Sequence, residues 1–188
     1  MENLVTITIN GKTAQVPSNY TIMQAADEMG ISIPRLCFLK DINENASCRV
    51  CVVEIAGMRS LKNSCSVEVG SILNREGTAT IYTNSKRVRS SVRQTLELIA
   101  ANHRFDCWKC PREHNCELLA LLRRFSIDNK MAESGEFAKK LPIINESDAI
   151  VFDSSKCVLC GRCIAACEKL SGTGVLNFNE RGFVTCVG

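Results

Sequence analysis

Strict alternation of hydrophobic and polar positions opens the chain and predicts a β-hairpin. Residues 3–9 alternate with the period of two that a half-buried strand requires. Asn10-Gly11 follows, and this dipeptide is the strongest short hairpin signal because both residues tolerate a positive φ. Residues 12–17 then supply the returning strand.

A helix is expected directly after this hairpin. Thr21 and Gln24 have the spacing of a capping box, and Gly30 stands where a left-handed C-terminal cap is wanted. The apolar stripe between them consists of Ile22, Ala25, Ala26 and Met29. Strand, turn, strand and helix are the opening of a ubiquitin-like β-grasp, and residues 52–55 and 78–82 read as further strands that complete a small mixed sheet ending near residue 83.

The hydrophobic period lengthens after residue 83. An apolar stripe with basic residues opposite it predicts an amphipathic helix over 84–102, with His103 at or just beyond its C-terminal end. The stripe consists of Val88, Val92, Leu96 and Ile99. Further along, the pattern predicts a short helix over 116–125, a polar connector over 126–155, a helix over 164–170 and a strand over 182–188. The fold class is therefore α+β.

Composition turns attention to the cysteines. The chain has 188 residues, a net charge of +3 and twelve cysteines, with no basic-then-apolar leader pattern and no run of 18 apolar residues. These features predict a cytoplasmic location, where thiols stay reduced, so the cysteines are better read as metal ligands than as disulfides. The basic residues near position 90 are not interleaved with aromatics, which argues against nucleic acid and leaves a solvated helix face or a docking surface for an acidic partner.

The first ligand set lies in the loop after the predicted β-grasp helix. It consists of Cys37, Cys48, Cys51 and Cys65. A 2Fe-2S cluster needs two thiolates on each iron, and a loop followed by a CxxC unit can wrap one. A zinc site with four cysteine ligands also uses CxxC units and stays open as the alternative.

The second set follows the amphipathic helix and contains one imidazole. It consists of His103, Cys107, Cys110 and Cys116. This spacing predicts a 4Fe-4S cluster with one histidine and three cysteine ligands, and zinc is again the alternative, since it accepts the same donors. His114, between Cys110 and Cys116, is interpreted as a loop histidine.

The third set is a ferredoxin-type run of Cys157, Cys160, Cys163 and Cys167. In such a run three cysteines hold one 4Fe-4S cluster and the fourth serves a neighbouring cluster. The fourth ligand of this cluster stays open between Cys186, a Cys167 that bends back and residues beyond the end of the chain. We favour the last, because 182–188 reads as an interrupted strand, and Cys186 itself fits a small apolar residue.

The order of the three sets resembles the amino-terminal iron-sulfur region of several oxidoreductases. A β-grasp 2Fe-2S site, HxxxCxxCxxxxxC and CxxCxxCxxxC occur in this order in FeFe hydrogenases, the complex I large iron-sulfur subunit, diaphorase iron-sulfur subunits and some NAD-dependent formate dehydrogenases. The stretch KCVLCGRCIAACE at 156–168, followed by Gly172–Gly174 and 179–183, looks most like the NAD-linked multi-subunit FeFe hydrogenases. The resemblance covers essentially the whole chain.

This resemblance implies four segments and three clusters. The segments are a β-grasp 2Fe-2S domain (1–83), a helical histidine-ligated 4Fe-4S domain (84–125), a connector (126–155) and a partial bacterial-ferredoxin-like 4Fe-4S domain (156–188). The 2Fe-2S cluster would be held by the first set and one 4Fe-4S cluster by the second. Cys157, Cys160 and Cys163 would hold a further 4Fe-4S cluster, and Cys167 would ligate a fourth cluster whose other cysteines are absent from this chain.

The function implied is an electron-transfer module without a catalytic residue of its own. It would relay single electrons between a flavin-containing NADH-oxidising subunit and a hydrogenase catalytic domain or subunit, or a ferredoxin. Alternatives within the same class are the iron-sulfur subunit of a complex I-like NADH dehydrogenase, of a diaphorase or of a formate dehydrogenase. A zinc-stabilised interaction scaffold is the alternative from a different class.

Overall fold

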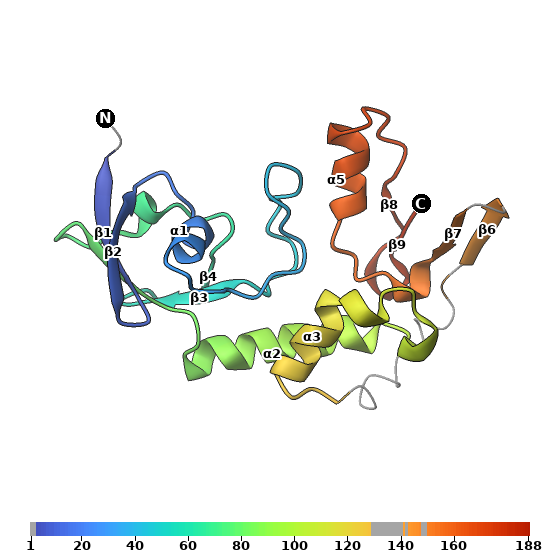
Figure 1. The fold of residues 1–188 in the computed structure, drawn as a ribbon, viewed down its shortest axis with the longest axis horizontal. Coiled ribbons are helices and arrows are strands. Elements are labelled where there is room, and N and C mark those ends of the chain that lie inside the picture. The colour runs from blue at the N-terminus through green and yellow to red at the C-terminus, as the bar shows by residue number, and fades with distance from the viewer. Residues whose placement is uncertain (1–2, 129–140, 142, 148–149) are drawn as a thin grey trace. The chain divides into compact units, whose positions relative to one another are not determined.

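A computed structural model describes residues 3–128, 141, 143–147 and 150–188 (Figure 1). The chain divides into two compact units, of which unit 1 comprises Met1–Phe38 with Glu44–Val92. Unit 2 comprises Leu39–Asn43 with Arg93–Gly188. The finer division at residues 83, 125 and 155 stays a prediction.

Unit 1 is built on a five-stranded mixed sheet with the strand order β2-β1-β5-β3-β4. Its strands are β1 (Leu4–Ile9), β2 (Lys12–Pro17), β3 (Val52–Ile55), β4 (Lys62–Asn63) and β5 (Thr78–Tyr82). β1 pairs antiparallel with β2 through a turn in which Asn10 and Gly11 have φ of 51° and 85°, and parallel with β5. Four strands and the hairpin turn are confirmed, whereas β4 is too short for the sequence pattern to reveal.

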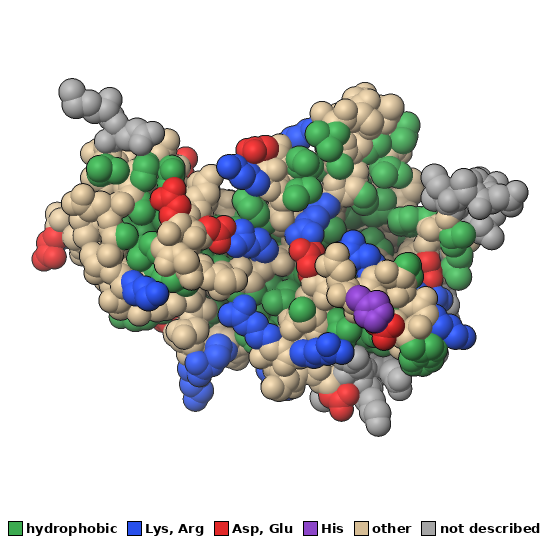
Figure 2. All heavy atoms as spheres, viewed as in Figure 1, with side chains coloured by type: hydrophobic (Ala, Val, Ile, Leu, Met, Phe, Trp, Pro, Cys, Tyr) green, Lys and Arg blue, Asp and Glu red, His purple; other side chains and the backbone are tan. Residues whose placement is uncertain are grey.

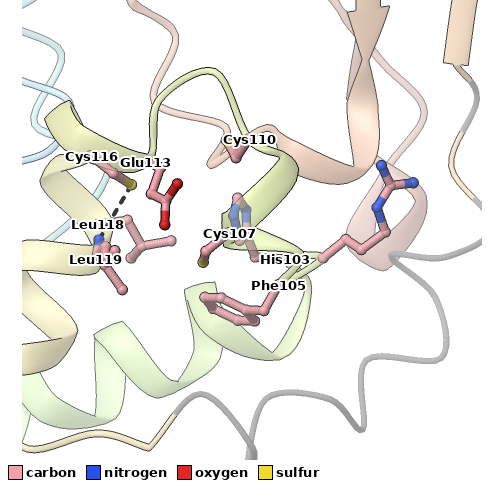
Figure 3. A pocket seen from close by; sticks show the side chains of 9 residues that line it. His103, Phe105, Cys107, Cys110, Glu113, Cys116, Leu118 and Leu119 are labelled. Carbon is pink, nitrogen blue, oxygen red and sulfur yellow. Dashed lines mark hydrogen bonds between the residues drawn. The ribbon is translucent and has the colours of Figure 1, made fainter.

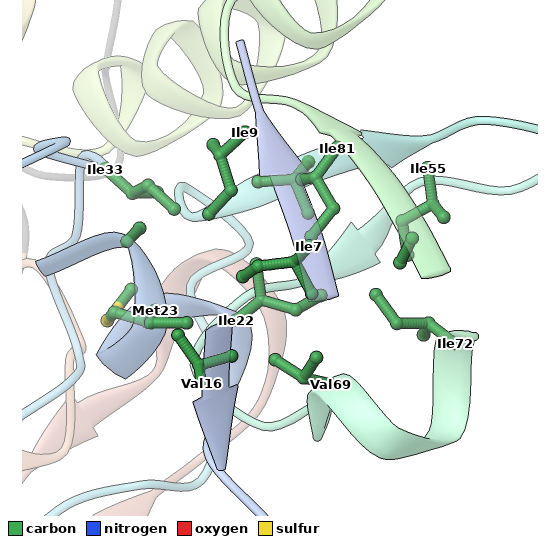
Figure 4. Close-up of a cluster of buried hydrophobic side chains, with 14 of the residues drawn as sticks. Ile7, Ile9, Val16, Ile22, Met23, Ile33, Ile55, Val69, Ile72 and Ile81 are labelled. Carbon is green, nitrogen blue, oxygen red and sulfur yellow. The ribbon is translucent and has the colours of Figure 1, made fainter. Parts of the chain in front are cut away.

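Helix α1 (Ile22–Glu28) packs its apolar stripe into the core of unit 1. The predicted capping box is present, since Gln24 N donates to Thr21 Oγ1 at 3.2 Å and Thr21 N donates to Gln24 Oε1 at 2.8 Å. The 3-10 helix η1 (Val69–Ile72) contributes Val69 to the same core. Figure 4 shows isoleucines of the sheet gathered with Ile22 of α1 and Ile72 of η1, so β-branched side chains from strands and helices form this core.

Helix α2 (Lys86–Ala101) follows β5, and the boundary between the two units falls within it after Val92. Val88, Val92 and Leu96 are buried as predicted, but the fourth buried position is Ala100, and Ile99 is only half-buried. The stripe therefore keeps a spacing of four along the whole helix. A smaller residue than isoleucine sits at its C-terminal end, next to His103.

Unit 2 contains helices and two short hairpins. Helix α3 (Glu117–Arg124) begins after Cys116, whose Sγ accepts a hydrogen bond from Leu119 N at 3.4 Å as an N-cap. Strands β6 (Ile143–Ser147) and β7 (Ile150–Asp153) pair antiparallel within the range that we expected to be connector, because each apolar run is too short to stand out from a loop. Of the expected connector, residues 129–140, 142 and 148–149 lie outside the described part of the chain.

The remainder of unit 2 carries the third ligand set. Helix α5 (Arg162–Lys169) begins two residues earlier than predicted, after Gly161 at φ 74°. The expected strand over 182–188 is only partly correct, because Gly182 adopts a φ of 68° and opens a 3-10 turn before the chain extends. The elements here are η5 (Ser154–Lys156), β8 (Phe178–Asn179), η6 (Gly182–Val184) and β9 (Cys186–Val187), preceded near α3 by η2 (Cys107–Lys109) and η3 (Glu113–Asn115).

Basic and acidic side chains are intermixed on the face drawn in Figure 2, and Lys and Arg form no single large patch there. Large apolar side chains do stay exposed in the last part of unit 2. These are Leu170, Val175, Phe178, Phe183 and Val184. Among the described residues, no helix has the length and apolar character needed to cross a membrane.

Candidate metal centres

The four cysteines of the first set form two close pairs in unit 1. The Sγ atoms of Cys51 and Cys65 lie 3.4 Å apart in a hydrogen bond, and Cys37 and Cys48 are also hydrogen-bonded to each other. Three of the four are almost fully buried, while Cys48 is half-buried. Two thiols per pair is the arrangement that a 2Fe-2S rhomb needs, with one pair on each iron.

Hydrogen bonding within each pair makes one thiol more acidic and the other less so. It lowers the pKa of Cys37 to about 5 while raising that of Cys48. In the other pair it lowers the pKa of Cys51 to about 6 and raises that of Cys65. Thiolate is the form that binds metal, so in each pair one thiol, Cys37 or Cys51, is favoured in that form.

The loop that carries the first set is shaped by unusual backbone conformations. Ala46 and Arg49 have positive φ values of 53° and 59° on either side of Cys48. Ser47 hydrogen-bonds to Cys37 through backbone and side chain, and the backbone of Val50 hydrogen-bonds to Cys48. Amides held this close to the thiols can donate to cluster sulfur, a known means of setting a reduction potential.

Arg35 is a cation within electrostatic reach of the buried pair of the first set. Arg35 is held in a two-pronged ion pair by Asp27, with N···O distances of 2.9 and 2.5 Å. This pairing raises the pKa of Arg35, and the Cys51 and Cys65 thiolates add to the effect, so the guanidinium lies within electrostatic reach of both. Sequence reasoning missed Arg35, whose role depends on where the chain folds back.

All four predicted residues of the second set line one cavity in unit 2 (Figure 3). The cavity has a volume of about 330 Å³, including the solvent at its mouth, and its wall is completed by Phe105, Glu113, Leu118 and Leu119 among others. His114, which we interpreted as a loop residue, is exposed and does not line it. One sequence motif has thus brought an imidazole and three thiols around a common space.

His103 has the properties of a ligand without a protein partner. The backbone N–H of His103 donates to Ala100 O at 3.0 Å, which places His103 just after α2, as predicted. The imidazole ring packs edge-on against Phe105, with ring centroids 4.9 Å apart. Its buried Nδ1 has no hydrogen-bond partner among the described residues. Burial lowers the pKa of His103 to about 4, with the Lys156 charge adding to the effect, so the imidazole is in the neutral form that binds metals.

The described residues contain no group of three His, Cys, Asp or Glu side chains gathered as for one metal ion. Zinc would draw its sulfur ligands to about 2.3 Å from a single point. A cubane cluster instead spreads its four ligands around a core of irons and sulfides. His103 and the three thiols line a common cavity, and the choice of a 4Fe-4S cluster for the second set stays a prediction.

The third set lies on a tight turn before α5. Leu159 N donates to Cys157 Sγ at 3.3 Å, and Leu159 has a positive φ of 53°. Burial raises the pKa of Cys157, and the thiolates of Cys160, Cys163 and Cys186 contribute further. Cys160, Cys163 and Cys186, the last of them in β9, therefore lie within electrostatic reach of Cys157.

Cys167 lies in a different environment from the other cysteines of its run. Its Sγ is 3.2 Å from Thr173 Oγ1, and this hydrogen bond, with others from the backbone of Val175 and Leu176, lowers the pKa of Cys167 to about 7. The expectation that α5 turns Cys167 away from the first three thiols stays a prediction.

A charged network joins the loops of the second and third sets, and sequence reasoning missed it. Arg104 Nη2 lies 2.5 Å from Asp153 Oδ2, and Lys156 Nζ lies 2.9 Å from Asp106 Oδ1. Arg104 N also donates to Ser155 O at 2.9 Å. These residues neighbour His103, Cys107 and Cys157, so the two candidate centres share one scaffold.

Three protein-family models match successive parts of the chain. A 2Fe-2S iron-sulfur cluster binding domain matches residues 2–73, and the NADH-ubiquinone oxidoreductase-G iron-sulfur binding region matches residues 93–130. A 4Fe-4S binding domain matches residues 150–169. The chain therefore combines one 2Fe-2S domain with 4Fe-4S binding domains in a mixed α/β fold.

Curated relatives align over nearly the whole chain. NADP-reducing hydrogenase subunit HndD of Solidesulfovibrio fructosivorans is 40% identical over 98% of this chain. Iron hydrogenase 1 of Clostridium pasteurianum is 32% identical over 97%, and a G-type subunit of NADH-quinone oxidoreductase from Rhizobium meliloti (strain 1021) is 28% identical over 98%. The alignments span 31%, 31% and 21% of those proteins, so this chain corresponds to less than a third of each.

The fold has a counterpart among solved structures. A chain from the crystal structure of NAD+-reducing NiFe-hydrogenase in the H2-reduced state superimposes with a TM-score of 0.76 at 24% identity, covering 97% of this chain and 74% of that one. Fold, domain order and relatives agree. This chain is a homologue of the iron-sulfur region that NAD(P)-linked hydrogenases share with the G-type subunits of NADH-quinone oxidoreductases.

Proposed function

We propose that this chain is an electron-relay module that binds one 2Fe-2S cluster and two 4Fe-4S clusters. The observation that carries the proposal is the cavity in which His103, Cys107, Cys110 and Cys116 meet, next to a third cysteine set in the same compact unit. When bound, the clusters would supply one-electron redox chemistry. The chain itself would space, bury and hydrogen-bond them.

The candidate ligands of the proposal follow the three sets. The 2Fe-2S cluster would use Cys37 with Cys48 on one iron and Cys51 with Cys65 on the other, as their pairing suggests. The histidine-ligated 4Fe-4S cluster would use the second set, whose imidazole is neutral and whose Nδ1 lacks a partner among the described residues. The third would use Cys157, Cys160 and Cys163, and Cys167 is kept as a possible ligand of a further cluster.

We place this relay in an NAD-linked FeFe hydrogenase. The higher identity to the hydrogenase HndD, 40% against 28% for the Rhizobium meliloti oxidoreductase, supports this context over a complex I-like dehydrogenase. A flavin-containing NADH-oxidising subunit would donate or accept electrons at one end, and a hydrogenase catalytic domain, or a ferredoxin, at the other. The exposed apolar side chains between Leu170 and Val184 support binding to another protein. A cytoplasmic location is part of the same proposal.

The cluster content is tested by spectroscopy on anaerobically purified protein. A relay should be brown, with visible absorbance and with separate 2Fe-2S and 4Fe-4S EPR signals after reduction. His103→Ala should remove or alter one 4Fe-4S signal and leave the 2Fe-2S signal intact. Colourless protein that contains zinc would instead establish the interaction scaffold.

The assignment to a hydrogenase is tested by isolating the complex that contains this chain and measuring its activity. The complex should be isolated under anaerobic conditions from its own cells through a tag on this chain and assayed for hydrogen-dependent reduction of NAD+ and NADP+. Hydrogen oxidation in that complex supports the hydrogenase assignment. NADH oxidation with quinone as acceptor and without any reaction with hydrogen would assign the chain to a dehydrogenase instead.

A further inference from the structure

We propose that Asn43 is a positioning residue of the third 4Fe-4S site, whose side chain fixes the backbone of the ligand loop at Cys160. The inference rests on the proposed cluster content and adds to it a residue that acts on the cluster through the loop. Asn43 lies in the sequence between Cys37 and Cys48 of the first set, inside the residues 2–73 matched by the 2Fe-2S domain. Neither the ligand spacing nor the family models connect it with the third set.

The side chain of Asn43 contacts the third ligand loop directly. Its Nδ2 donates to Cys160 O at 2.9 Å, although 117 positions separate the two residues. Asn43 is only 3% exposed, and a buried amide is stable in such a place when it is hydrogen-bonded. The segment Leu39–Asn43 belongs to unit 2 together with the third set, whereas its neighbours in the sequence belong to unit 1. Leu39–Asn43 is therefore part of the unit that holds the third site.

The segment Leu39–Asn43 is closed by its own backbone. Asn43 N donates to Leu39 O at 2.7 Å, and Leu39 N donates to Asn43 O at 2.9 Å. Asp41, midway between them, has a positive φ of 62°. Asp41 O also accepts a hydrogen bond at 3.4 Å from Nζ of Lys169, the last residue of α5. A turn closed in this way presents the Asn43 side chain from a defined position.

The ligand loop that Asn43 contacts has a strained backbone. Leu159 and Gly161, on either side of Cys160, have positive φ values of 53° and 74°. A left-handed conformation is costly for a residue with a side chain, so Leu159 keeps it only where surrounding contacts hold it. The hydrogen bond from Asn43 is such a contact. Because the Cys160–Gly161 peptide is planar, fixing its carbonyl also fixes the direction of Gly161 N–H at the N-cap of α5.

This peptide joins two candidate ligands of one cluster. Cys160 is its first residue, and Cys163 lies in the first turn of α5, two residues after Gly161. A rotation of the peptide would therefore move the two cysteines relative to each other. Contacts that orient metal ligands set the affinity and the potential of the metal site. Loss of the hydrogen bond from Asn43 should thus affect the third cluster selectively.

Replacement of Asn43 by leucine separates hydrogen bonding from packing. Leucine has nearly the shape of asparagine but cannot donate a hydrogen bond, so a residue that only fills space would tolerate the change. The third cluster is recognised as the 4Fe-4S EPR signal that His103→Ala leaves unchanged. In the full chain, purified anaerobically, Asn43→Leu should shift the reduction potential of this cluster. Since lost supporting contacts weaken metal sites by about 10- to 100-fold, its iron should also pass to a chelator about tenfold faster or more.

Two further variants complete the test. Asn43→Asp keeps the size of the side chain and presents an acceptor in place of the donor, so it should change the third cluster at least as much as leucine does. Asn45→Leu is the matched control, because Asn45 is exposed and its Oδ1 accepts from Ser47 N at 3.3 Å within unit 1. It should leave the potential and the iron release of the third cluster as in the wild type. Persistence of the 2Fe-2S and histidine-ligated signals in each variant shows that it is folded.

The outcomes distinguish this inference from the proposed function. Wild-type protein without two 4Fe-4S signals would overturn the proposed cluster content itself. Wild-type protein with both signals, together with an unchanged third cluster in Asn43→Leu or the same change in Asn45→Leu, would overturn only the role of Asn43. Loss of the 2Fe-2S signal along with the third in Asn43→Leu would also overturn that role, because the residue would then be a structural part of the first ligand loop.

Discussion

Asp153 is the residue whose replacement should most clearly destabilise the scaffold between the second and third candidate centres. Its Oδ1 accepts hydrogen bonds from Ser155 N at 3.1 Å and Ser155 Oγ at 2.5 Å, and its Oδ2 accepts from Arg104 Nη2 at 2.5 Å. One carboxylate thus caps η5 and anchors the segment that follows His103. Both side chains are mostly shielded from water, with exposed fractions of 18% for Asp153 and 29% for Arg104.

The magnitude follows from these contacts. Loss of an N-cap costs about 0.5–2 kcal/mol, and a hydrogen bond to a charged group contributes about 1.5–3 kcal/mol. Because partial exposure weakens the ion pair, we expect Asp153→Ala to lower the free energy of unfolding by about 2–4 kcal/mol. Asp153→Asn can keep the cap and loses mainly the charge, so it should cost roughly half as much.

The assay is urea unfolding of the anaerobic holoprotein, followed by bleaching of the visible absorbance. With a urea dependence of about 3 kcal/mol per molar for a chain of this size, the Asp153→Ala midpoint should fall by about 1 M. Glu97→Gln removes a charge from the exposed Arg93–Glu97 pair and should shift the free energy by about 0.5 kcal/mol or less. A double-mutant cycle of Asp153→Asn with Arg104→Gln should give a coupling above about 1 kcal/mol, and a value within the additivity error of about 0.5 kcal/mol would refute the reasoning.

Three further predictions concern the clusters and the core. His103→Cys should retain a 4Fe-4S cluster but lower its reduction potential, because a thiolate adds a negative charge; an unchanged redox titration would exclude His103 as a ligand. Arg35→Gln should lower the 2Fe-2S potential by on the order of tens of millivolts, since a cation near Cys51 and Cys65 favours the reduced state, while Asp27→Asn should raise it. Equal 2Fe-2S potentials in the wild type and both variants would show that the charge of Arg35 does not affect the cluster. Leu96→Ala should cost about 2–5 kcal/mol because Leu96 is fully buried, whereas Leu98→Ala, at a 70% exposed position on the same helix, should change stability by less than about 0.5 kcal/mol; similar denaturation midpoints would contradict the packing of α2.

Local signals in the sequence were sufficient for most of unit 1. The hairpin at Asn10-Gly11 and the capping box of Thr21 are decided by residues within a few positions of each other, and both are present in the structure. The error at Ile99 has a similarly local origin. A spacing of three fits an ideal helix as well as a spacing of four does, and only packing within unit 2 decides that Ala100 is the buried residue.

For the candidate centres, too, only the local features were predictable from the sequence. The spacing of His103 and three cysteines was enough to predict that they belong to one set, and all four line one cavity. The contacts around them are not local: Arg104 meets Asp153 over 49 positions, and Asn43 donates to Cys160 O at 2.9 Å over 117 positions. The sequence pattern does not predict these long-range polar contacts, since each partner alone resembles an ordinary polar surface residue.

The non-local contacts also explain why the third site needs more than its own motif. The turn at Leu159 presents three thiols, but the turn itself is positioned by other segments. Asn43 donates to the backbone of Cys160, and Arg104 N donates to Ser155 O at the base of the turn. Metal sites depend on such supporting contacts for geometry and potential as much as on the ligands. A change in any of these segments should therefore alter the third cluster while the CxxCxxC sequence stays intact, and the segment after α2, which also carries His103, should transmit the same change to the second.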